Sequence, residues 1–330
     1  MVSRMKLFIW PGAWGLPSFD AHCLAAALYL QLVAPGKFAL IESADPDSAP
    51  CGQLPYLEHA GACVSGLDAI IDHFSGTLDA ELSPCEAATS LAWRSFVDTH
   101  LGTLLAHTLF AIGPNYYPLT RNTLASNLPV PQRYYAPARL RDLYREKLEH
   151  AGLWDVGYED TGENKDRLKN IFSTKSDEDE DGGKIRTAFG RERVREKAND
   201  LLAPIARLLA GKSFVYQERP TSLDLLLAAH ILLLVEPPYP DSVIATTLKD
   251  STAYQPLVTH ARLILSLAYP TTPGPNHLPP QIIFASPPSL TYVPILLATE
   301  HPWLRFASYS ATSLAVVATL AIIARTRTVQ

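Results

Sequence analysis

Strand signals in this 330-residue chain are confined to residues 1–76, and this confinement limits the folds that the chain can adopt. From about residue 86 onward, apolar residues recur at helical spacing, first in one long segment and then in shorter ones separated by Pro and Gly. With 47% apolar residues, a chain of this length can fill two cores. The sequence therefore predicts an α+β protein with a mixed domain at 1–76 and an all-helical domain at 77–267.

The first domain has signals in the order strand, helix, strand, and then strand, strand, helix. The predicted elements are 6–10, 18–32, 37–42, 54–58, 62–64 and 67–74. This order is that of a thioredoxin-like domain. Ser18 is the expected N-cap of the first helix. Leu54 and Pro55 open a strand after a glycine-containing loop, where such domains keep a cis proline.

The helical domain is predicted from its apolar segments, at 86–112, 137–150, 187–210, 221–235 and 254–267. Thr221 and Asp224 have the spacing of a capping box at the start of the fourth segment. Residues 155–186 include an acidic run and two adjacent glycines, and they cannot bury enough apolar area to offset the entropy of ordering. We expect a disordered surface insertion at 155–186, either a solvated loop or an acidic docking segment for a basic partner.

The C-terminal part has the pattern of a tether and a membrane anchor. Residues 268–302 are rich in proline and should run extended. They lead to 306–324, an uncharged run flanked by arginines. As a helix this run would be about 28 Å long, close to the thickness of the hydrocarbon core of a bilayer. We expect a C-terminal transmembrane helix within an anchor at 303–330; a helix buried against the soluble body is the alternative.

Charge, cysteine content and the N-terminus limit the partners and the compartment. The formal net charge of −5 leaves no basic footprint for nucleic acid. The cysteines show no metal-binding spacing and indicate a reducing compartment; they are Cys23, Cys51, Cys63 and Cys85. The N-terminus lacks the apolar core of a secretory signal, so the body is expected to face the cytosol.

The chain resembles the metaxin branch of the glutathione-transferase superfamily in three stretches: WPGAWGLPSFDAHCLAAALYLQL, GQLPYLEHAG and FVYQERPTSLDLLLAAHILLL. The similarity covers most of residues 5–267. It implies a glutathione-transferase-like fold and the role of the larger metaxin-type subunit of the fungal mitochondrial sorting and assembly machinery. A subunit of this kind would lie at the mitochondrial outer membrane, with its body facing the cytosol.

The same resemblance implies an activity and a set of partners. The protein would assist the insertion and assembly of β-barrel precursors through protein contacts. The implied partners are a membrane-embedded β-barrel insertase subunit, a second metaxin-like subunit and the precursors, with the lipid bilayer contacted through 306–324. We expect no nucleic acid, no cofactor, no metal and no catalytic residue.

Catalysis in this superfamily needs a Tyr, Ser or Cys near the start of the first helix. Leu16 stands at that position and cannot donate a hydrogen bond to a thiolate. Ser18 and Cys23 are nearby substitutes, but an N-cap and a buried position explain them better. Ser65 and Gly66 stand where an acidic residue and a serine hold the γ-glutamyl group, and Gly66 has no side chain for it. The sequence thus favours a protein that is not an enzyme. The alternatives are a tail-anchored glutathione-dependent transferase or reductase and a soluble elongation-factor-like binding module.

The histidines have no spacing typical of a metal site. His22 and His73 could share a region with Cys23, and His100 and His107 lie seven residues apart on one predicted helix face. No H-x-x-x-H pair occurs, and neither does a glycine-rich nucleotide loop or a G-x-S-x-G elbow. Structural roles are therefore expected for these histidines.

Overall fold

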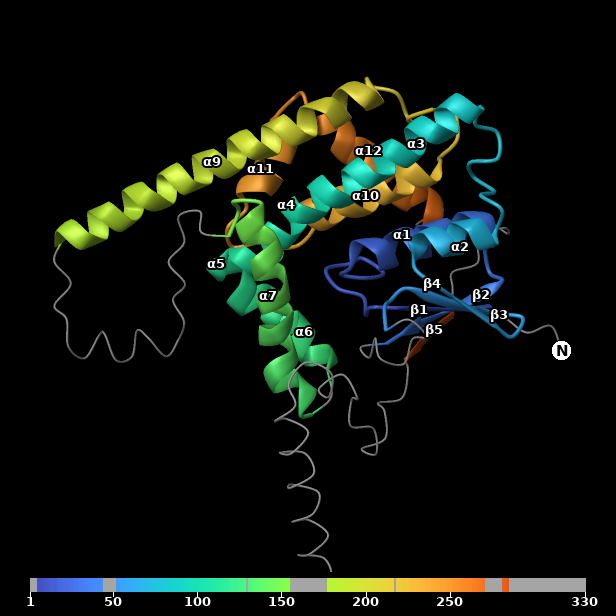
Figure 1. Cartoon of the computed structure of the whole chain (residues 1–330), viewed down its shortest axis with the longest axis horizontal. Helices are drawn as coiled ribbons and strands as arrows, with labels where there is room; N and C mark the ends of the chain where they lie inside the picture. Colours follow the sequence, from blue (N-terminus) through green and yellow to red (C-terminus); the bar gives the residue numbers. More distant parts are fainter. Residues whose placement is uncertain are drawn as a thin grey trace, which may run out of the picture. The chain divides into compact units, whose positions relative to one another are not determined.

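The computed structural model describes residues 5–43, 52–128, 130–154, 177–216, 218–270 and 281–284 (Figure 1). These residues belong to one compact unit, Met1–Ala285. No helix among them is long and apolar enough to cross a membrane. The transmembrane helix expected at 306–324 lies outside the described residues, as does most of the expected tether.

The N-terminal part forms the expected strand and helix order. Its elements are β1 Met5–Ile9, α1 Ala21–Val33, β2 Phe38–Glu42, β3 Tyr56–His59, β4 Ala62–Ser65 and α2 Leu67–His73. Strand β1 pairs in parallel with β2 and antiparallel with β3, and β3 pairs antiparallel with β4. The peptide bond between Leu54 and Pro55 is cis, as expected. The thioredoxin-like topology predicted for this part is confirmed.

A fifth strand corrects the expectation that strands end near residue 76. Strand β5, Gln281–Phe284, pairs in parallel with β2, so the sheet order is β4-β3-β1-β2-β5. It falls inside the stretch that was expected to be an extended tether, 268–302. The segment is apolar and contains two β-branched isoleucines, and the outer edge of β2 would otherwise present unpaired backbone groups. The extended chain thus returns to the sheet.

The remaining described elements are helical. They are α3 Pro84–Phe96, η2 Val97–Leu101, α4 Gly102–Ala106, η3 His107–Ala111, α5 Gly113–Asn115, η4 Tyr116–Thr120, α6 Arg121–Asn127, α7 Gln132–His150, α9 Asp177–Leu209, α10 Ser222–Val235, α11 Val243–Asp250 and α12 Gln255–Ala268. The long helix expected at 86–112 is present, but two π-helical turns, η2 and η3, interrupt it. The α+β class is confirmed, with a sheet and a helical part. The helices between 113 and 127 and α11 were not expected.

Helix α9 begins ten residues before the predicted start at 187. Residues 177–186, expected to be part of a disordered insertion, are helical, and 155–176 lie outside the described residues. Disorder was expected here because the segment can bury little apolar surface. However, acidic residues near a helix N-terminus interact favourably with the helix dipole, and residues 177–181 are all acidic.

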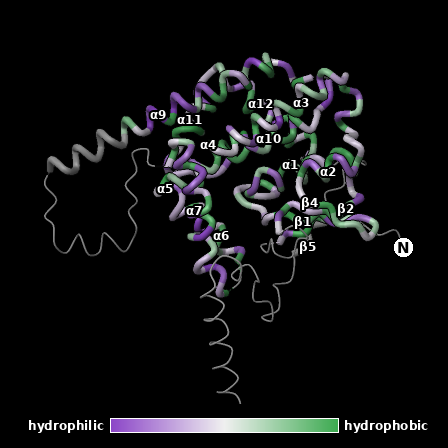
Figure 2. The backbone as a smooth tube through the Cα atoms, viewed as in Figure 1, coloured by the Kyte–Doolittle hydropathy of each residue, from purple (hydrophilic) through white to green (hydrophobic). Residues whose placement is uncertain are grey.

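Helix α10 is the centre of the helical part, and every one of its residues is buried. It packs against α12 and α3, and also against α1 of the N-terminal part (Figure 1). Figure 2 shows the hydrophobic backbone segments gathered where these helices meet. Apolar side chains from both parts form one contiguous core. The domain division at residue 76 stays a prediction.

The N-cap of α1 differs from the prediction. The helix begins at Ala21, and Asp20 caps it by accepting a 2.9 Å hydrogen bond from the backbone N–H of Cys23. Ser18 is fully buried, and its hydroxyl accepts a hydrogen bond from the N–H of Asp20. Ser18 therefore positions the residue that caps the helix. Both residue types are good N-caps, so the sequence alone did not separate them.

The start of α10 has a buried carboxylate with four partners. Asp224 accepts hydrogen bonds from the backbone N–H of Thr221 at 2.9 Å, from the Thr221 hydroxyl at 2.7 Å and from the N–H of Val215 at 3.0 Å. The oxygen that accepts from Val215 also lies 3.0 Å from His260 Nε2 on α12. Both side chains of the Asp224–His260 pair are almost completely buried. The capping box predicted from Thr221 and Asp224 is present, and it extends to two further segments.

Replacing Asp224 with alanine should lower the free energy of unfolding by about 3 kcal/mol or more, because the N–H groups of Val215 and Thr221 would be buried without an acceptor. Ser83→Ala is the matched control. It removes a capping box at the exposed start of α3 and should cost about 1 kcal/mol. Urea unfolding of both variants, followed by circular dichroism, measures the difference. Equal losses would contradict the role given to the buried partners.

Candidate functional site

A cleft of about 320 Å³ opens beside the cis proline, between the N-terminal part and α3. Its lining comes from the start of β3, the start of α2, α1, α3 with η2, and α10. The lining residues are His22, Gln53, Leu54, Pro55, Gly66, Leu67, Asp68, Leu91, Arg94, Ser95, Asp98 and Leu226. This volume lies at the lower end of the range of small-molecule sites, about 300–1,000 Å³.

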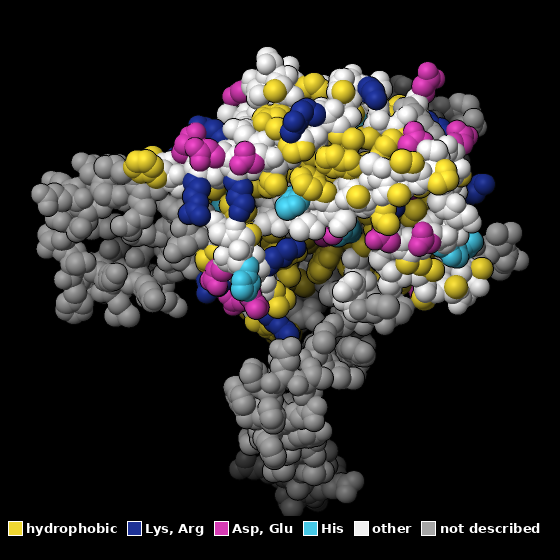
Figure 3. All heavy atoms as spheres, turned by 45° about the horizontal axis from the view of Figure 1, so that its top comes forward, with side chains coloured by type: hydrophobic (Ala, Val, Ile, Leu, Met, Phe, Trp, Pro, Cys, Tyr) yellow, Lys and Arg dark blue, Asp and Glu magenta, His cyan; other side chains and the backbone are white. Residues whose placement is uncertain are grey.

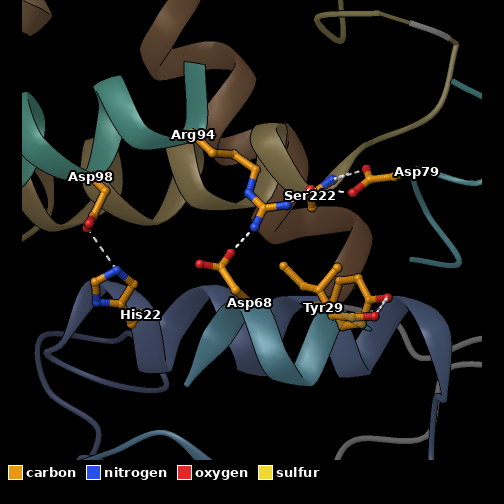
Figure 4. A network of polar contacts seen from close by, with 8 residues as sticks. His22, Tyr29, Asp68, Asp79, Arg94, Asp98 and Ser222 are labelled. Atoms are coloured by element: carbon orange, nitrogen blue, oxygen red, sulfur yellow. Dashed lines mark hydrogen bonds and ion pairs between the residues drawn. The ribbon is translucent and has the colours of Figure 1, made fainter. Parts of the chain in front are cut away.

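Arg94 of α3 is the fixed positive charge of the cleft (Figure 4). Its guanidinium donates a hydrogen bond to the Ser222 hydroxyl at 3.3 Å and forms an ion pair with Asp68 at the start of α2. Burial lowers the pKa of Arg94, but an arginine stays protonated at neutral pH. Arg94 thereby joins α3 to α2 and to the start of α10.

Asp79, from the loop after α2, completes this network. Its carboxylate accepts hydrogen bonds from the backbone N–H of Ser222 at 2.9 Å and from the Ser222 hydroxyl at 2.5 Å (Figure 4). Backbone N–H groups at a helix start lack partners within the helix and favour a negative charge. The loop after the N-terminal part is therefore fixed to the central helix by electrostatics.

A second charged pair lies along the same cleft. His22 of α1 contacts Asp98 of η2 at 2.8 Å (Figure 4). The hydrogen bond to Asp98 raises the pKa of His22, and the same bond lowers the pKa of Asp98. Behind this pair, the ring of His230 meets that of His22 edge-on, and burial lowers the pKa of His230 to about 4. His230 is thus neutral near pH 7, and of the two imidazoles it is that of His22, beside Asp98, whose protonated form is favoured.

The residues at and near the position expected for a thiol-activating group are buried and do not line the cleft. Leu16 is buried, and Ser18 and Cys23 are fully buried. Burial raises the pKa of the Cys23 thiol well above its usual range, and the Cys23 sulfur accepts a hydrogen bond from the N–H of Trp10. Such a thiol is inert, because the thiolate is the reactive form. Leu16, Ser18 and Cys23 are not among the residues that line the cleft. Gly66 does line it, but it has no side chain.

The histidines have separate partners. His73 contacts His59 at 2.9 Å, whereas His22 contacts Asp98. His107 is buried and contacts the carbonyl of Leu153. His100 packs on the ring of Phe96. No group of three or more metal-binding side chains occurs in the part of the chain that the structure describes.

Three charged residues of the cleft, Asp68, Arg94 and Asp98, were not identified from the sequence. Arg94 and Asp98 are four residues apart on the predicted helix at 86–112, so they share a face of it. That spacing was an available signal. Their partners Asp68 and His22 lie far away in the sequence, and no local pattern identifies them.

Comparison with known proteins gives both a family and relatives. Residues 23–141 match the model of the Tom37 family, described as Outer mitochondrial membrane transport complex protein. The chain is 28% identical to Metaxin-1 of Mus musculus over 286 residues, which cover 85% of this chain and 80% of that protein. It is 30% identical to Metaxin-1 of Homo sapiens over 275 residues, which cover 82% of this chain and 52% of that protein.

The solved structures with a similar chain path include two glutathione S-transferases. One, from Ceriporiopsis subvermispora in complex with glutathione, covers 82% of this chain and 99% of its own at 15% identity and a TM-score of 0.48. A second, bound with lactoylglutathione, covers 80% of this chain and 100% of its own at 14% identity and a TM-score of 0.41.

Asp98→Asn should lower the pKa of His22, because the amide carries no charge to favour the imidazolium. The pKa of His22 is raised in the folded state above its ordinary value of 6.5. The stability that protonated His22 contributes is therefore complete below about pH 6.5 and is lost as the pH rises through the folded-state pKa. The pKa of Asp98 is lowered in the folded state below its ordinary value of 3.8. The stability that ionised Asp98 contributes is therefore present above about pH 3.8 and is lost as the pH falls through the folded-state pKa. NMR titration of the His22 ring protons measures the shift.

The control for this titration is Asp68→Asn. Asp68 lines the same cleft but pairs with Arg94, so its replacement should leave the titration of His22 unchanged. Identical His22 curves in the unmodified protein and in Asp98→Asn would show that the pair does not form in solution.

Proposed function

This chain belongs to the metaxin family, and on that basis we propose that it is a non-enzymatic subunit of a transport complex of the mitochondrial outer membrane. More specifically, we propose the role of the larger metaxin-type subunit of the sorting and assembly machinery. Its body would face the cytosol and assist the insertion of β-barrel precursors. The partners in this proposal are a membrane-embedded barrel insertase and a second metaxin-like subunit.

The observation that carries the non-enzymatic part of the proposal is the chemistry of the cleft. Leu16 is buried without a donor group, Cys23 is a buried thiol with a raised pKa, and Gly66 has no side chain. The charged residues that line the cleft, Arg94 and Asp98 among them, are paired with other parts of the fold. These residues stabilise the junction between α1, α2 and α3. They are not arranged to lower the pKa of a bound thiol.

A protein without such chemistry acts through its surfaces. Figure 3 shows a face on which hydrophobic side chains gather in the upper middle part, between scattered charges. Large exposed apolar side chains include Leu91, Leu143 and Phe189. Contiguous exposed apolar surface is typical of protein contact sites. Such surfaces support a role in holding partner proteins.

The proposal includes a membrane anchor at 303–330, with 306–324 as the span. The support for it is the uncharged sequence and its length. Confining the body and its partners to one membrane raises their effective concentration, so modest contacts suffice for a stable complex.

Loss of this protein should slow the assembly of outer-membrane β-barrels and leave import into the matrix intact. Assembly of a radiolabelled barrel precursor, followed on native gels in mitochondria that lack the protein, measures this rate. The full chain should restore the rate, and a chain without 303–330 should restore it in part, because its body contacts remain. Normal assembly in the absence of the protein would contradict the proposed role.

The second candidate function is a glutathione-dependent transferase or reductase. The observation in its favour is the open cleft beside the cis proline. We expect no conjugation of glutathione and no saturable binding, because Leu16 and Gly66 provide neither a donor to the thiolate nor a contact to the γ-glutamyl group. Calorimetric titration with glutathione, with an active glutathione transferase as the positive control, tests this. Saturable binding at cellular glutathione concentrations would favour the enzyme.

A further inference from the structure

One stretch of the helical part, residues 99–141, contains basic residues but no acidic ones. From Thr99 to Arg141 the sequence has no aspartate or glutamate, and its basic residues are Arg121, Arg133, Arg139 and Arg141. Arg141 is buried and stacks over the ring of Tyr116. The other three arginines are exposed. The charged side chains of this stretch, which lies between Asp98 and Asp142, are therefore all basic, although the whole chain carries a formal net charge of −5.

Helix α6 leads into the start of α7 (Figure 1), and exposed apolar and aromatic side chains lie at this connection. Val130 is 58% exposed, Tyr134 75% and Tyr135 40%. Together with Arg133 and Arg139 they form what we name the α6–α7 tip. Exposing three such side chains within six residues is unfavourable in water, so a contact that covers them would be stabilising.

The α6–α7 tip is held in place by the fold. Helix α6 packs along α7, with Leu124 buried between them and the rest of the helical part. The guanidinium of Arg133 donates hydrogen bonds to the carbonyl of Leu128 from both Nε and Nη2, each at 3.3 Å. The aromatic side chains are therefore presented by an ordered hairpin of helices.

We propose that the α6–α7 tip rests on an anionic lipid surface, in addition to any C-terminal anchor. Tyrosine rings are enriched at membrane interfaces, where the ring contacts acyl chains and the hydroxyl contacts water. Exposed arginines interact with anionic headgroups while their stems lie along apolar surface. The combination of Tyr134 and Tyr135 with Arg133 and Arg139 fits that chemistry; the next acidic residue along α7 is Asp142, three residues beyond Arg139.

A lipid surface fits the α6–α7 tip better than a protein does. A stable protein interface takes about 800 Å² and 20–30 residues from each partner, whereas this tip consists of five side chains. A peripheral lipid contact is weak by itself and becomes effective when it acts together with a second attachment. The tip would then set which face of the body lies toward the membrane.

The test places a fluorophore at the tip of the full chain. Cys51, Cys63 and Cys85 are replaced with serine, Cys23 is buried, and Tyr134→Cys carries acrylodan. The matched control is Phe189→Cys on α9, which is 74% exposed, close to the 75% of Tyr134. Both proteins are added to phosphatidylcholine vesicles with and without phosphatidylinositol, and emission and quenching by acrylamide are recorded.

We expect a blue shift and a loss of quenching at position 134 in the vesicles that contain phosphatidylinositol, and neither change at position 189. Raising the salt to 1 M shortens the Debye length from about 8 Å to about 3 Å and should remove most of the shift. Equal emission at both positions in these vesicles would overturn the proposal. A shift at 134 that appears only with protein-containing outer-membrane vesicles would also overturn it, in favour of a protein partner.

Discussion

The carboxylate of Asp224 is the point on which the helical part depends. An ion buried among apolar side chains is tolerated only when hydrogen bonds replace its lost hydration. Thr221, Val215 and His260 supply these bonds from three different segments of the chain. One carboxylate thus fixes the start of α10, the loop before it and α12. Because α10 also packs against α1, the position of the N-terminal part follows from the same interaction.

The candidate site is a consequence of this arrangement. Ser222 follows Thr221 directly. Its backbone N–H and its hydroxyl both donate hydrogen bonds to Asp79, and the hydroxyl also accepts one from Arg94. Arg94 in turn pairs with Asp68 at the start of α2. The polar groups at the junction are therefore used in joining one part of the fold to the other. The charged side chains that line the cleft are therefore used to hold the fold together, and this supports the proposal that the protein acts by binding.

Sequence reasoning succeeded where the signal is local. The capping box of Thr221 and Asp224, the strand order of the first 76 residues and the cis proline at Pro55 each depend on neighbours in the sequence. It failed where a distant segment decides. Strand β5 exists because β2 has an open edge, and Arg94 acquires its role from Asp68, 26 residues away. The start of α9 at Asp177 was missed because composition was weighed without the helix dipole.

We propose that this protein works by holding partners together and not by transforming a substrate. Purifying the full chain from gently solubilised outer membranes, and identifying by mass spectrometry what elutes with it at constant ratio, tests that claim most directly. We expect a stable complex that contains a membrane-embedded barrel protein and a second metaxin-like chain. Elution of the chain by itself, at the mass of a monomer, would contradict it.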